Sequence, residues 1–386
     1  MVQRQLQEKL LELRDKFPFI AITGPRQSGK TTIAEHTFPD YRRVSLEDLD
    51  NREFALSDPR GFIASYPDRT IIDEVQRVPS LLSYLQTYTD TKGKEGMYIL
   101  TGSQNMNLME SIDQSLAGRV GLLTLLPFSL QELRMASMMP ETVNRAIFKG
   151  CFPRVYDKDI SPVDYYQSYI RTYIQRDVRE LKDIGNLMTF NRFVRLCAGR
   201  TGQLLNKSSL AVECGVSAPT IDSWLSVLEA SCIIHFLQPD FHNFSKRLVK
   251  TPKLYFCDTG LACSLLEIKS ESQLDSHYMR GNLFENMIVN EFLKSDYNEG
   301  TEPSLSFWRD NVGHEIDLLK SVAGGTRGYE IKSGATVSGD WFKGLSFWGG
   351  LSGEGTDNRA VIYGGDRLLS TSSGKAIPWT EDFSNL

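Results

Sequence analysis

The nine residues GPRQSGKTT, at positions 24–32, constrain the fold of this chain more than any other stretch. The apolar run FPFIAIT (17–23) precedes them and predicts a buried strand, and TTIAEHTF (31–38) follows as the start of a helix. Glycines at such a junction let the backbone curl so that consecutive N–H groups point at one anion, and the helix N-terminus adds its positive end. The stretch therefore predicts a phosphate-binding loop of the form G-x-x-x-x-G-K-[ST], in an α/β domain with a parallel sheet.

The whole loop is expected to contact a bound nucleotide. Its residues are Gly24, Pro25, Arg26, Gln27, Ser28, Gly29, Lys30, Thr31 and Thr32. Lys30 is placed to reach the β- and γ-phosphates, and the hydroxyl of Thr31 to ligate Mg²⁺. The predicted cofactors are therefore ATP and Mg²⁺.

A second acidic element lies in RTIIDEVQRVP (69–79), where Asp73 and Glu74 end a short apolar strand. Asp73 is expected to hold Mg²⁺ through water, and Glu74 to orient and polarise the water that attacks the γ-phosphate. An Asp-Glu pair at a strand end is common by itself. Its position downstream of a phosphate-binding loop favours the catalytic interpretation.

Two further positions are candidates for the same site. In MYILTGSQN (97–105) the Ser103 hydroxyl follows another apolar strand and could contact the γ-phosphate or the attacking water; Asn105 is a weaker candidate. A simple Ser/Asn turn explains the pattern equally well. In SLAGRVGLLTLLPFSLQEL (115–133), Arg119 precedes an apolar strand. It could act as an arginine finger on the nucleotide of a neighbouring subunit in a homo-oligomer, or anchor its loop through a salt bridge.

Taken together, GPRQSGKTT, IIDEVQ, LTGSQN and LAGRV…LPFSLQEL resemble the AAA+-type ATPases that carry a C-terminal domain of the DUF4143 class. The resemblance continues in GCFPRVY (150–156), YIQRDVREL (173–181) and KTPKLYFCDTGLA (250–262), and so covers nearly the whole chain. It implies an ATPase of the bacterial or archaeal cytoplasm.

The middle of the chain is predicted to be helical. SPVDYYQSYIRTYIQRDVREL (161–181) begins with a capping serine and a proline and predicts a long helix. One of its arginines, at positions 171, 176 and 179, could approach a nucleotide, but such a helix face is more often solvated or ion-paired.

Residues 207–239 have the layout of a helix-turn-helix, and CIIHFL and KLYF could form the strands of a wing. The second helix carries Asp222 and Glu229 but no Lys or Arg, which argues against reading of bases in the major groove. The basic residues lie in the wing instead: His242, Lys246, Arg247, Lys250 and Lys253. They could contact the phosphates of DNA or RNA, or the winged helix could be purely structural; both interpretations stay open.

The C-terminal part predicts a helix (278–294), three strands (305–309, 314–319, 328–332), a second helix (339–348) and a last strand (359–363). Glu285 shares the apolar face of the first helix, where a carboxylate is costly unless it is paired or binds a cation. Asp317 stands on the second strand, and Glu330 and Lys332 share one face of the third. These carboxylates could converge into an oxygen-rich site that suits Mg²⁺.

This order of elements, with its E…D…E-x-K residues, resembles the core of PD-(D/E)xK nucleases. The resemblance implies that Asp317 and Glu330 are metal ligands, Lys332 is the catalytic lysine and Glu285 is an outer ligand or orients the ligands. An E-x-K pair on a strand is also a common charge pattern. Since nuclease-like domains can bind nucleic acid without cutting it, both cleavage and binding alone stay open.

Composition argues against a membrane-spanning segment and against a disulfide framework. No apolar run approaches the roughly 18 residues that span a bilayer, and the six scattered cysteines include no C-x-x-C pair, which fits a reducing cytoplasm. The net charge of −5 means that contact with nucleic acid must come from local basic patches.

We therefore predict three domains: a P-loop AAA+-type ATPase domain (1–140), a helical and winged-helix domain (141–270) and a nuclease-like α/β domain (271–386). The predicted function is ATP hydrolysis coupled to binding or cleavage of nucleic acid. The alternative is a nucleotide-switched regulatory module whose nuclease-like domain is inactive and docks DNA or a protein.

Overall fold

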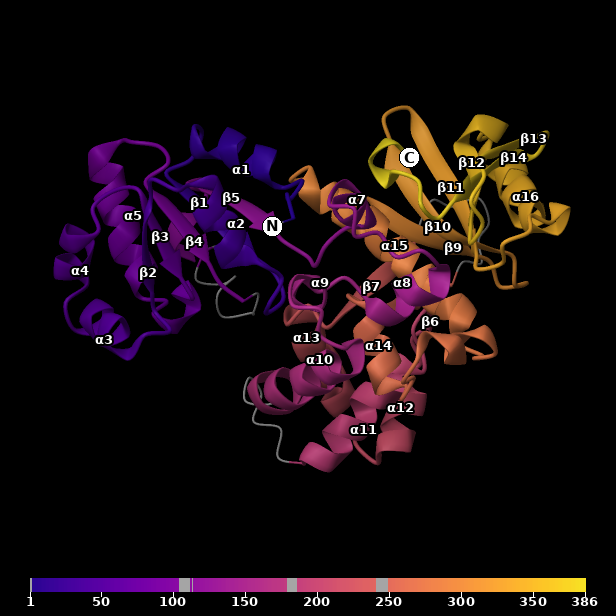
Figure 1. Ribbon diagram of the computed structural model, residues 1–386, viewed down its shortest axis with the longest axis horizontal. Coiled ribbons are helices and arrows are strands. Elements are labelled where there is room, and N and C mark those ends of the chain that lie inside the picture. The colour runs from indigo at the N-terminus through magenta and orange to yellow at the C-terminus, as the bar shows by residue number, and fades with distance from the viewer. Residues whose placement is uncertain (1, 104–111, 113, 179–185, 241–248) are drawn as a thin grey trace. The chain divides into compact units, whose positions relative to one another are not determined.

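A computed structural model describes residues 2–103, 112, 114–178, 186–240 and 249–386, with the side chains of 175–178 and 385 left out (Figure 1). The chain divides into two compact units. The first runs to Phe128 and includes the short segments Ala230–Cys232 and Tyr297–Thr301, and the second holds the remaining residues.

The first unit is built on a five-stranded sheet in the order β2-β3-β4-β1-β5, in which every pair of neighbours is parallel. Its strands are β1 (Phe19–Thr23), β2 (Arg42–Ser45), β3 (Thr70–Asp73), β4 (Tyr98–Thr101) and β5 (Val120–Thr124). Its helices are α1 (Gln7–Arg14), α2 (Lys30–Thr37), α3 (Leu49–Ser57), α4 (Pro59–Ser65) and α5 (Leu81–Lys92), with a 3₁₀ turn η1 (Val75–Arg77).

Helices cover both faces of this sheet. Along β1, Phe19 and Ala21 belong to one buried apolar cluster, and Ile20 and Ile22 belong to another. This alternation follows from the two-residue period of a strand. A strand buried on both faces reads as a continuous apolar run, as FPFIAIT does. The predicted α/β fold with a parallel P-loop sheet is confirmed.

The helices of the second unit come mostly before its sheet. They are α7 (Leu130–Met135), α8 (Val143–Lys149), α9 (Pro153–Asp157), α10 (Pro162–Tyr169), α11 (Leu187–Ala198), α12 (Lys207–Cys214), α13 (Ala218–Ala230) and α14 (Thr259–Leu265). The long helix predicted over 161–181 is found as α10 followed by a π-helical stretch η2 (Ile170–Val178), and its end lies outside the described residues. α12 and α13 flank a turn at Gly215, which has φ +70°, as the helix-turn-helix pattern predicts.

The sheet of the second unit has nine strands in the order β13-β14-β12-β11-β10-β9-β7-β8-β6. They are β6 (Gln203–Leu204), β7 (Ile234–Pro239), β8 (Lys253–Phe256), β9 (Leu305–Arg309), β10 (Glu315–Val322), β11 (Gly325–Lys332), β12 (Arg359–Tyr363), β13 (Leu369–Thr371) and β14 (Gly374–Pro378). The remaining elements are helices α15 (Arg280–Asn298) and α16 (Lys343–Ser352) and the 3₁₀ turns η3 (Glu271–Asp275), η4 (Gly339–Phe342), η5 (Thr356–Asn358) and η6 (Phe383–Asn385).

The strands expected to form a wing are part of this sheet. β7 pairs with β8, and β7 also runs parallel to β9 through Gln238 opposite Ser306 and Pro239 opposite Phe307. The regions predicted as two domains, before and after residue 270, therefore share one sheet. In the part of the chain that the structure describes, no helix is long and apolar enough to cross a membrane.

Candidate functional site

The predicted phosphate-binding loop connects β1 to α2 and depends on two glycines. Gly24 has φ +142°, and a Cβ at this position would lie 2.2 Å from the carbonyl oxygen of Leu125. Gly29 has φ +95° and is the N-cap of α2. Only glycine adopts these backbone conformations without strain, so the spacing of the two glycines fixes the path of the loop.

Lys30 is the first residue of α2 and is buried inside the loop. Its Nζ donates to the carbonyl oxygens of Pro25, at 2.7 Å, and Gly24, at 3.1 Å. Burial lowers the pKa of Lys30 to about 8, against the opposing effect of the Glu74 carboxylate. The lysine is therefore held by main-chain oxygens at the position where phosphates are expected.

Asp73 joins three elements at the carboxyl edge of the sheet. Its Oδ1 accepts hydrogen bonds from the hydroxyls of Thr31, at 2.9 Å, and Thr101, at 2.6 Å. Its Oδ2 pairs with the guanidinium of Arg43, at 2.7 Å. A threonine hydroxyl and a carboxylate side by side fit Mg²⁺, which prefers oxygen ligands and keeps several waters. Sequence reasoning missed Arg43, which lies on β2.

Glu74 and Ser103 follow the ends of β3 and β4. Glu74 has φ +58°, and its pKa is raised by burial and by Asp73, while Lys30 acts in the opposite direction. The hydroxyls of Ser103 and Ser28 are buried and have no hydrogen-bond partner among the described residues. Buried hydroxyls without partners are uncommon, and a phosphate or a water would satisfy them. The predicted contact of Ser103 with the nucleotide stays a prediction.

Arg119 lies at the amino-terminal ends of the strands of the same sheet, opposite the carboxyl ends where the phosphate-binding loop lies. Phe19 pairs with Val120, so Arg119 precedes the amino ends of β1 and β5, whereas the loop follows the carboxyl end of β1. Five residues of strand separate these edges by about 16 Å. Arg119 donates from Nε and Nη2 to the two oxygens of Asp90, at 2.7 and 3.1 Å. The salt bridge is observed, and action on a neighbouring nucleotide stays a prediction.

Five other candidate residues lie outside the described part of the chain: Asn105, Arg179, His242, Lys246 and Arg247. Arg171 and Lys250 are exposed, and the side chain of Arg176 is not described. Lys253 was one of the wing residues that could contact nucleic-acid phosphates, with a structural role left open. Its side chain is only 2% exposed, so it is not available for such a contact.

The four predicted residues of the C-terminal site do converge. Glu285 comes from α15, Asp317 from β10, and Glu330 and Lys332 from β11. Lys332 Nζ lies 2.5 Å from Glu330 Oε2 and 3.1 Å from Asp317 Oδ2, and Asp317 Oδ2 also accepts the N–H of Ile331 at 2.8 Å.

Four more side chains that were not predicted at this site belong to it: Lys253, Tyr255, Arg309 and Glu315. We refer to Glu285, Glu315, Asp317 and Glu330 as the carboxylate cluster. Lys253 Nζ lies 2.9 Å from Glu285 and 2.5 Å from Glu315. Tyr255 donates its O–H to Glu285 at 2.5 Å, and Arg309 pairs with Glu315 at 2.7 Å. Lys253 and Tyr255 are two residues apart in KLYF and so share one strand face.

The pKa values of the carboxyl groups in the cluster are shifted in different directions. Burial and the neighbouring Asp317 raise the pKa of Glu330 to about 8 in spite of Lys332. Burial also raises the pKa of Glu285. The pKa of Asp317 is lowered, because the ammonium groups of Lys332 and Lys253 outweigh the effect of burial.

The donor set at this cluster does not resemble a metal site. Within the described ranges, no three or more His, Cys, Asp or Glu side chains are arranged to hold a metal ion. The oxygens of Glu285, Asp317 and Glu330 are instead engaged by ammonium, hydroxyl and amide donors. The metal-ligand roles predicted for these carboxylates stay predictions.

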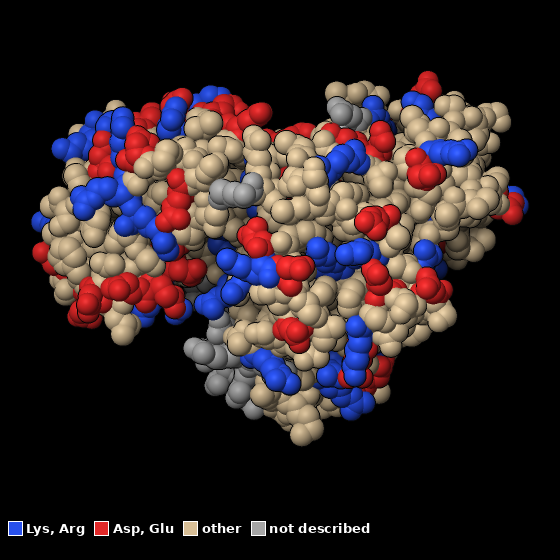
Figure 2. Space-filling view, viewed as in Figure 1, with Lys and Arg blue, Asp and Glu red and all other residues tan. Residues whose placement is uncertain are grey.

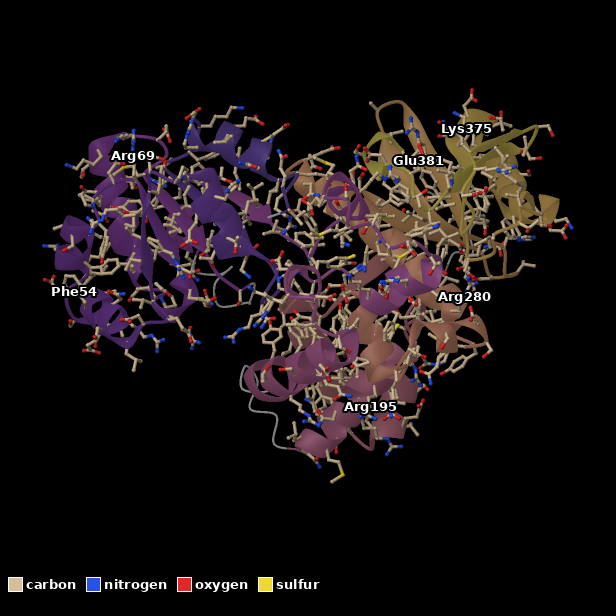
Figure 3. The ribbon with its side chains drawn as sticks, viewed as in Figure 1. Phe54, Arg69, Arg195, Arg280, Lys375 and Glu381 are labelled. Atoms are coloured by element: carbon tan, nitrogen blue, oxygen red, sulfur yellow. The ribbon has the colours of Figure 1, made fainter. Side chains whose placement is uncertain are left out.

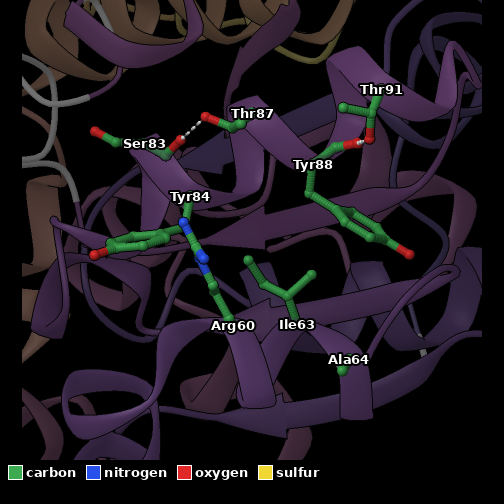
Figure 4. Close-up of a pocket in the computed structure, with 8 residues that line it drawn as sticks. All are labelled: Arg60, Ile63, Ala64, Ser83, Tyr84, Thr87, Tyr88 and Thr91. Carbon is green, nitrogen blue, oxygen red and sulfur yellow. Dashed lines mark hydrogen bonds between the residues drawn. The ribbon is translucent and has the colours of Figure 1, made fainter.

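Two cavities lie apart from both sites. One, of about 550 Å³, lies between α4 and α5 and is lined by Ile63, Tyr84 and Tyr88 with Arg60 at its side (Figure 4). The other, of about 710 Å³, includes Arg280, labelled in Figure 3, which donates to Asn144 and Ser333. Acidic and basic side chains intermingle on the face seen in Figure 2.

Three family models match consecutive parts of the chain. Residues 16–134 match an AAA domain, residues 140–272 match a domain of unknown function (DUF8612), and residues 280–381 match a domain of unknown function (DUF4143). The AAA match contains the loop, Asp73, Glu74, Ser103 and Arg119. The predicted P-loop ATPase domain and DUF4143 domain are confirmed, whereas the nuclease-like nature of the latter stays a prediction.

The curated relatives are described only as uncharacterized. The chain is 28% identical over 347 residues to protein Rv2008c of Mycobacterium tuberculosis and to protein Mb2031c of Mycobacterium bovis, which covers 87% of this chain and 75% of each relative. Among solved structures, a Walker-type ATPase of Pyrococcus abyssi, PABY2304, is 15% identical, with 69% of this chain and 96% of that chain covered and a TM-score of 0.48. The RuvB Holliday junction branch migration motor of Thermotoga maritima is 18% identical, with 61% and 89% covered and a TM-score of 0.33.

Proposed function

We propose that this chain, which carries an AAA-type P-loop domain followed by DUF8612 and DUF4143 domains, hydrolyses ATP and uses its nucleotide state to control what the C-terminal region binds. The observation that carries the proposal is the arrangement around Asp73. Thr31, which directly follows Lys30, and Thr101 at the end of β4 both donate to this carboxylate. One edge of the sheet thus offers the groups that phosphoryl transfer from ATP needs.

Each group has a role that its position supports. When ATP binds, the Lys30 ammonium exchanges its hydrogen bonds to main-chain oxygens for bonds to the β- and γ-phosphates. Because the ammonium is already buried, this exchange costs little additional desolvation free energy. Thr31 and Asp73 would hold Mg²⁺, which neutralises charge on the phosphate oxygens when bound. Glu74 orients the attacking water, and Arg43 holds the Asp73 carboxylate in place through their ion pair.

ATP turnover of purified variants tests this proposal. Lys30→Ala is expected to lose ATP binding, and Glu74→Gln to keep binding but to lose turnover by about 10²-fold or more. Lys94→Ala, which removes an exposed lysine of the same unit, is the matched control and should behave as wild type. Normal hydrolysis by Lys30→Ala would contradict the proposal.

A second function is favoured by the convergence of Glu285, Asp317, Glu330 and Lys332: contact of the C-terminal region with nucleic acid. Because ammonium, hydroxyl and amide donors already engage oxygens of Glu285, Asp317 and Glu330, binding without cleavage is favoured over a cutting activity. Plasmid, linear DNA, single-stranded DNA and RNA should be incubated with the protein in Mg²⁺ or Mn²⁺, with and without ATP. We expect ATP-dependent shifts in binding and no cut products. Cleavage that disappears in Asp317→Ala would establish the nuclease interpretation instead.

A further inference from the structure

The least expected side chain in the second unit is Lys253, the first residue of β8. Its ammonium is in contact with Glu285 at 2.9 Å and Glu315 at 2.5 Å, and lies 4.0 Å from Asp317. It also lies 5.4 Å from the centre of the Phe307 ring. Lysine is almost never fully buried unless it is paired, so a lysine only 2% exposed must have partners that replace its hydration.

The charges of the groups around Lys253 balance to within one unit without any further ion. The cluster contains four carboxyl groups, Glu285, Glu315, Asp317 and Glu330, and three permanent cations, Lys253, Lys332 and Arg309. With all seven groups ionised, the three cations offset all but one of the four negative charges. A divalent cation added to this set would give it a net positive charge, which is unfavourable in a low-dielectric interior.

The shape of the site also favours an ammonium over a metal ion. Mg²⁺ demands near-octahedral oxygen ligands and keeps several waters, which need space. Around Lys253 Nζ one side is an aromatic ring, which attracts an ammonium but offers no oxygen.

We propose that Lys253 is the resident cation of the carboxylate cluster. It takes the place that a divalent metal would need, so the cluster is a buried ionic connection and not a metal centre. The connection joins β8, from the region before residue 270, to α15 and β10 after it. This inference does not depend on ATP hydrolysis by the first unit.

Titration of nucleotide-free wild-type protein with Mn²⁺, followed by electron paramagnetic resonance, tests the proposal directly. We expect that Asp317→Asn removes no Mn²⁺ site, because wild type has none at the cluster. Asp73→Asn is measured in parallel, so that binding at the P-loop is recognised separately. A Mn²⁺ site present in wild type and in Asp73→Asn but lost in Asp317→Asn would overturn the proposal.

Replacement of the lysine gives a second, independent readout. Lys253→Met keeps the stem but removes the charge, so it should create a Mn²⁺ site and raise the melting temperature by a few degrees in millimolar Mn²⁺. Lys250→Met, an exposed lysine three residues earlier, is the matched control and should show neither effect. Adding Asp317→Asn to Lys253→Met should abolish the gain. A folded Lys253→Met without new Mn²⁺ binding would show that the lysine does not stand in for a metal, and if the variant does not fold, the wild-type titration decides.

Discussion

At the scale of single residues, the phosphate-binding loop depends on glycine for two separable reasons. Gly24 has a positive φ and also no room for a Cβ, whereas Gly93 has φ +57° with nothing within 4 Å of a Cβ. We expect Gly24→Ala to move β5 or the loop and to weaken ATP binding by about 10²-fold or more, since the Cβ must clear the Leu125 carbonyl. Gly93→Ala should cost about 1 kcal/mol of stability and leave ATP affinity unchanged. Calorimetric ATP binding to both variants measures this; equal affinities would mean that the close contact does not shape the site.

Single residues also show which parts of the candidate sites can be predicted from the sequence and which cannot. The loop, Asp73 and the E…D…E-x-K residues were predictable because local pattern and strand position determine them. The sequence places Lys253 in a basic wing because its neighbours in the chain are basic, but its partners lie on α15 and β10. No local pattern of charge distinguishes a solvated lysine from one that is buried among distant carboxylates.

At the scale of elements, the segments GCFPRVY (150–156) and KTPKLYFCDTGLA (250–262) meet at one buried carboxylate, that of Asp258. Asp258 caps α14 by accepting the N–H of Leu261 at 3.0 Å, and also accepts the N–H of Cys151 at 2.7 Å. Asp258→Ala leaves both amides buried without an acceptor, which should cost about 3 kcal/mol. Asn206, the exposed N-cap of α12, is the control, and Asn206→Ala should cost about 1 kcal/mol. Urea unfolding compares the two; similar losses would show that the contact with Cys151 contributes little.

His235 on strand β7 should make the free energy of unfolding depend on pH. Burial lowers the pKa of His235 from 6.5 to about 4, although its hydrogen bond with Asn290 opposes this. Between these values the folded state binds fewer protons than the unfolded state, so stability should rise as pH increases from about 4 to 6.5. His235→Gln should flatten that rise in melting temperature, whereas His36→Gln, on the exposed side of α2, should keep it. An unchanged slope in His235→Gln would refute this assignment.

At the scale of the whole molecule, the sequence predicts element order better than it predicts assembly. The strands and helices of the C-terminal part lie close to their predicted bounds. The pairing of β7 with β9, over Gln238 and Pro239, joins the three strands β6, β8 and β7 to the six others in one nine-stranded sheet. Such a pairing depends on contacts between residues far apart in the chain, and alternation within each strand does not reveal it.

The role of Arg119 depends on whether the protein forms oligomers. Arg119 lies too far from the phosphate-binding loop of its own chain to contact a nucleotide bound there. If Arg119 acts on the ATP of a neighbouring subunit, Arg119→Ala should lower turnover by about 10³-fold. Asp90→Ala breaks the same exposed ion pair but keeps the arginine, so it should leave turnover near wild type. Mixing Arg119→Ala with Glu74→Gln should restore part of the activity, because some interfaces then combine an intact Arg119 with an intact Glu74. Equal, small effects of Arg119→Ala and Asp90→Ala, with no recovery on mixing, would leave Arg119 as an anchor of its own loop.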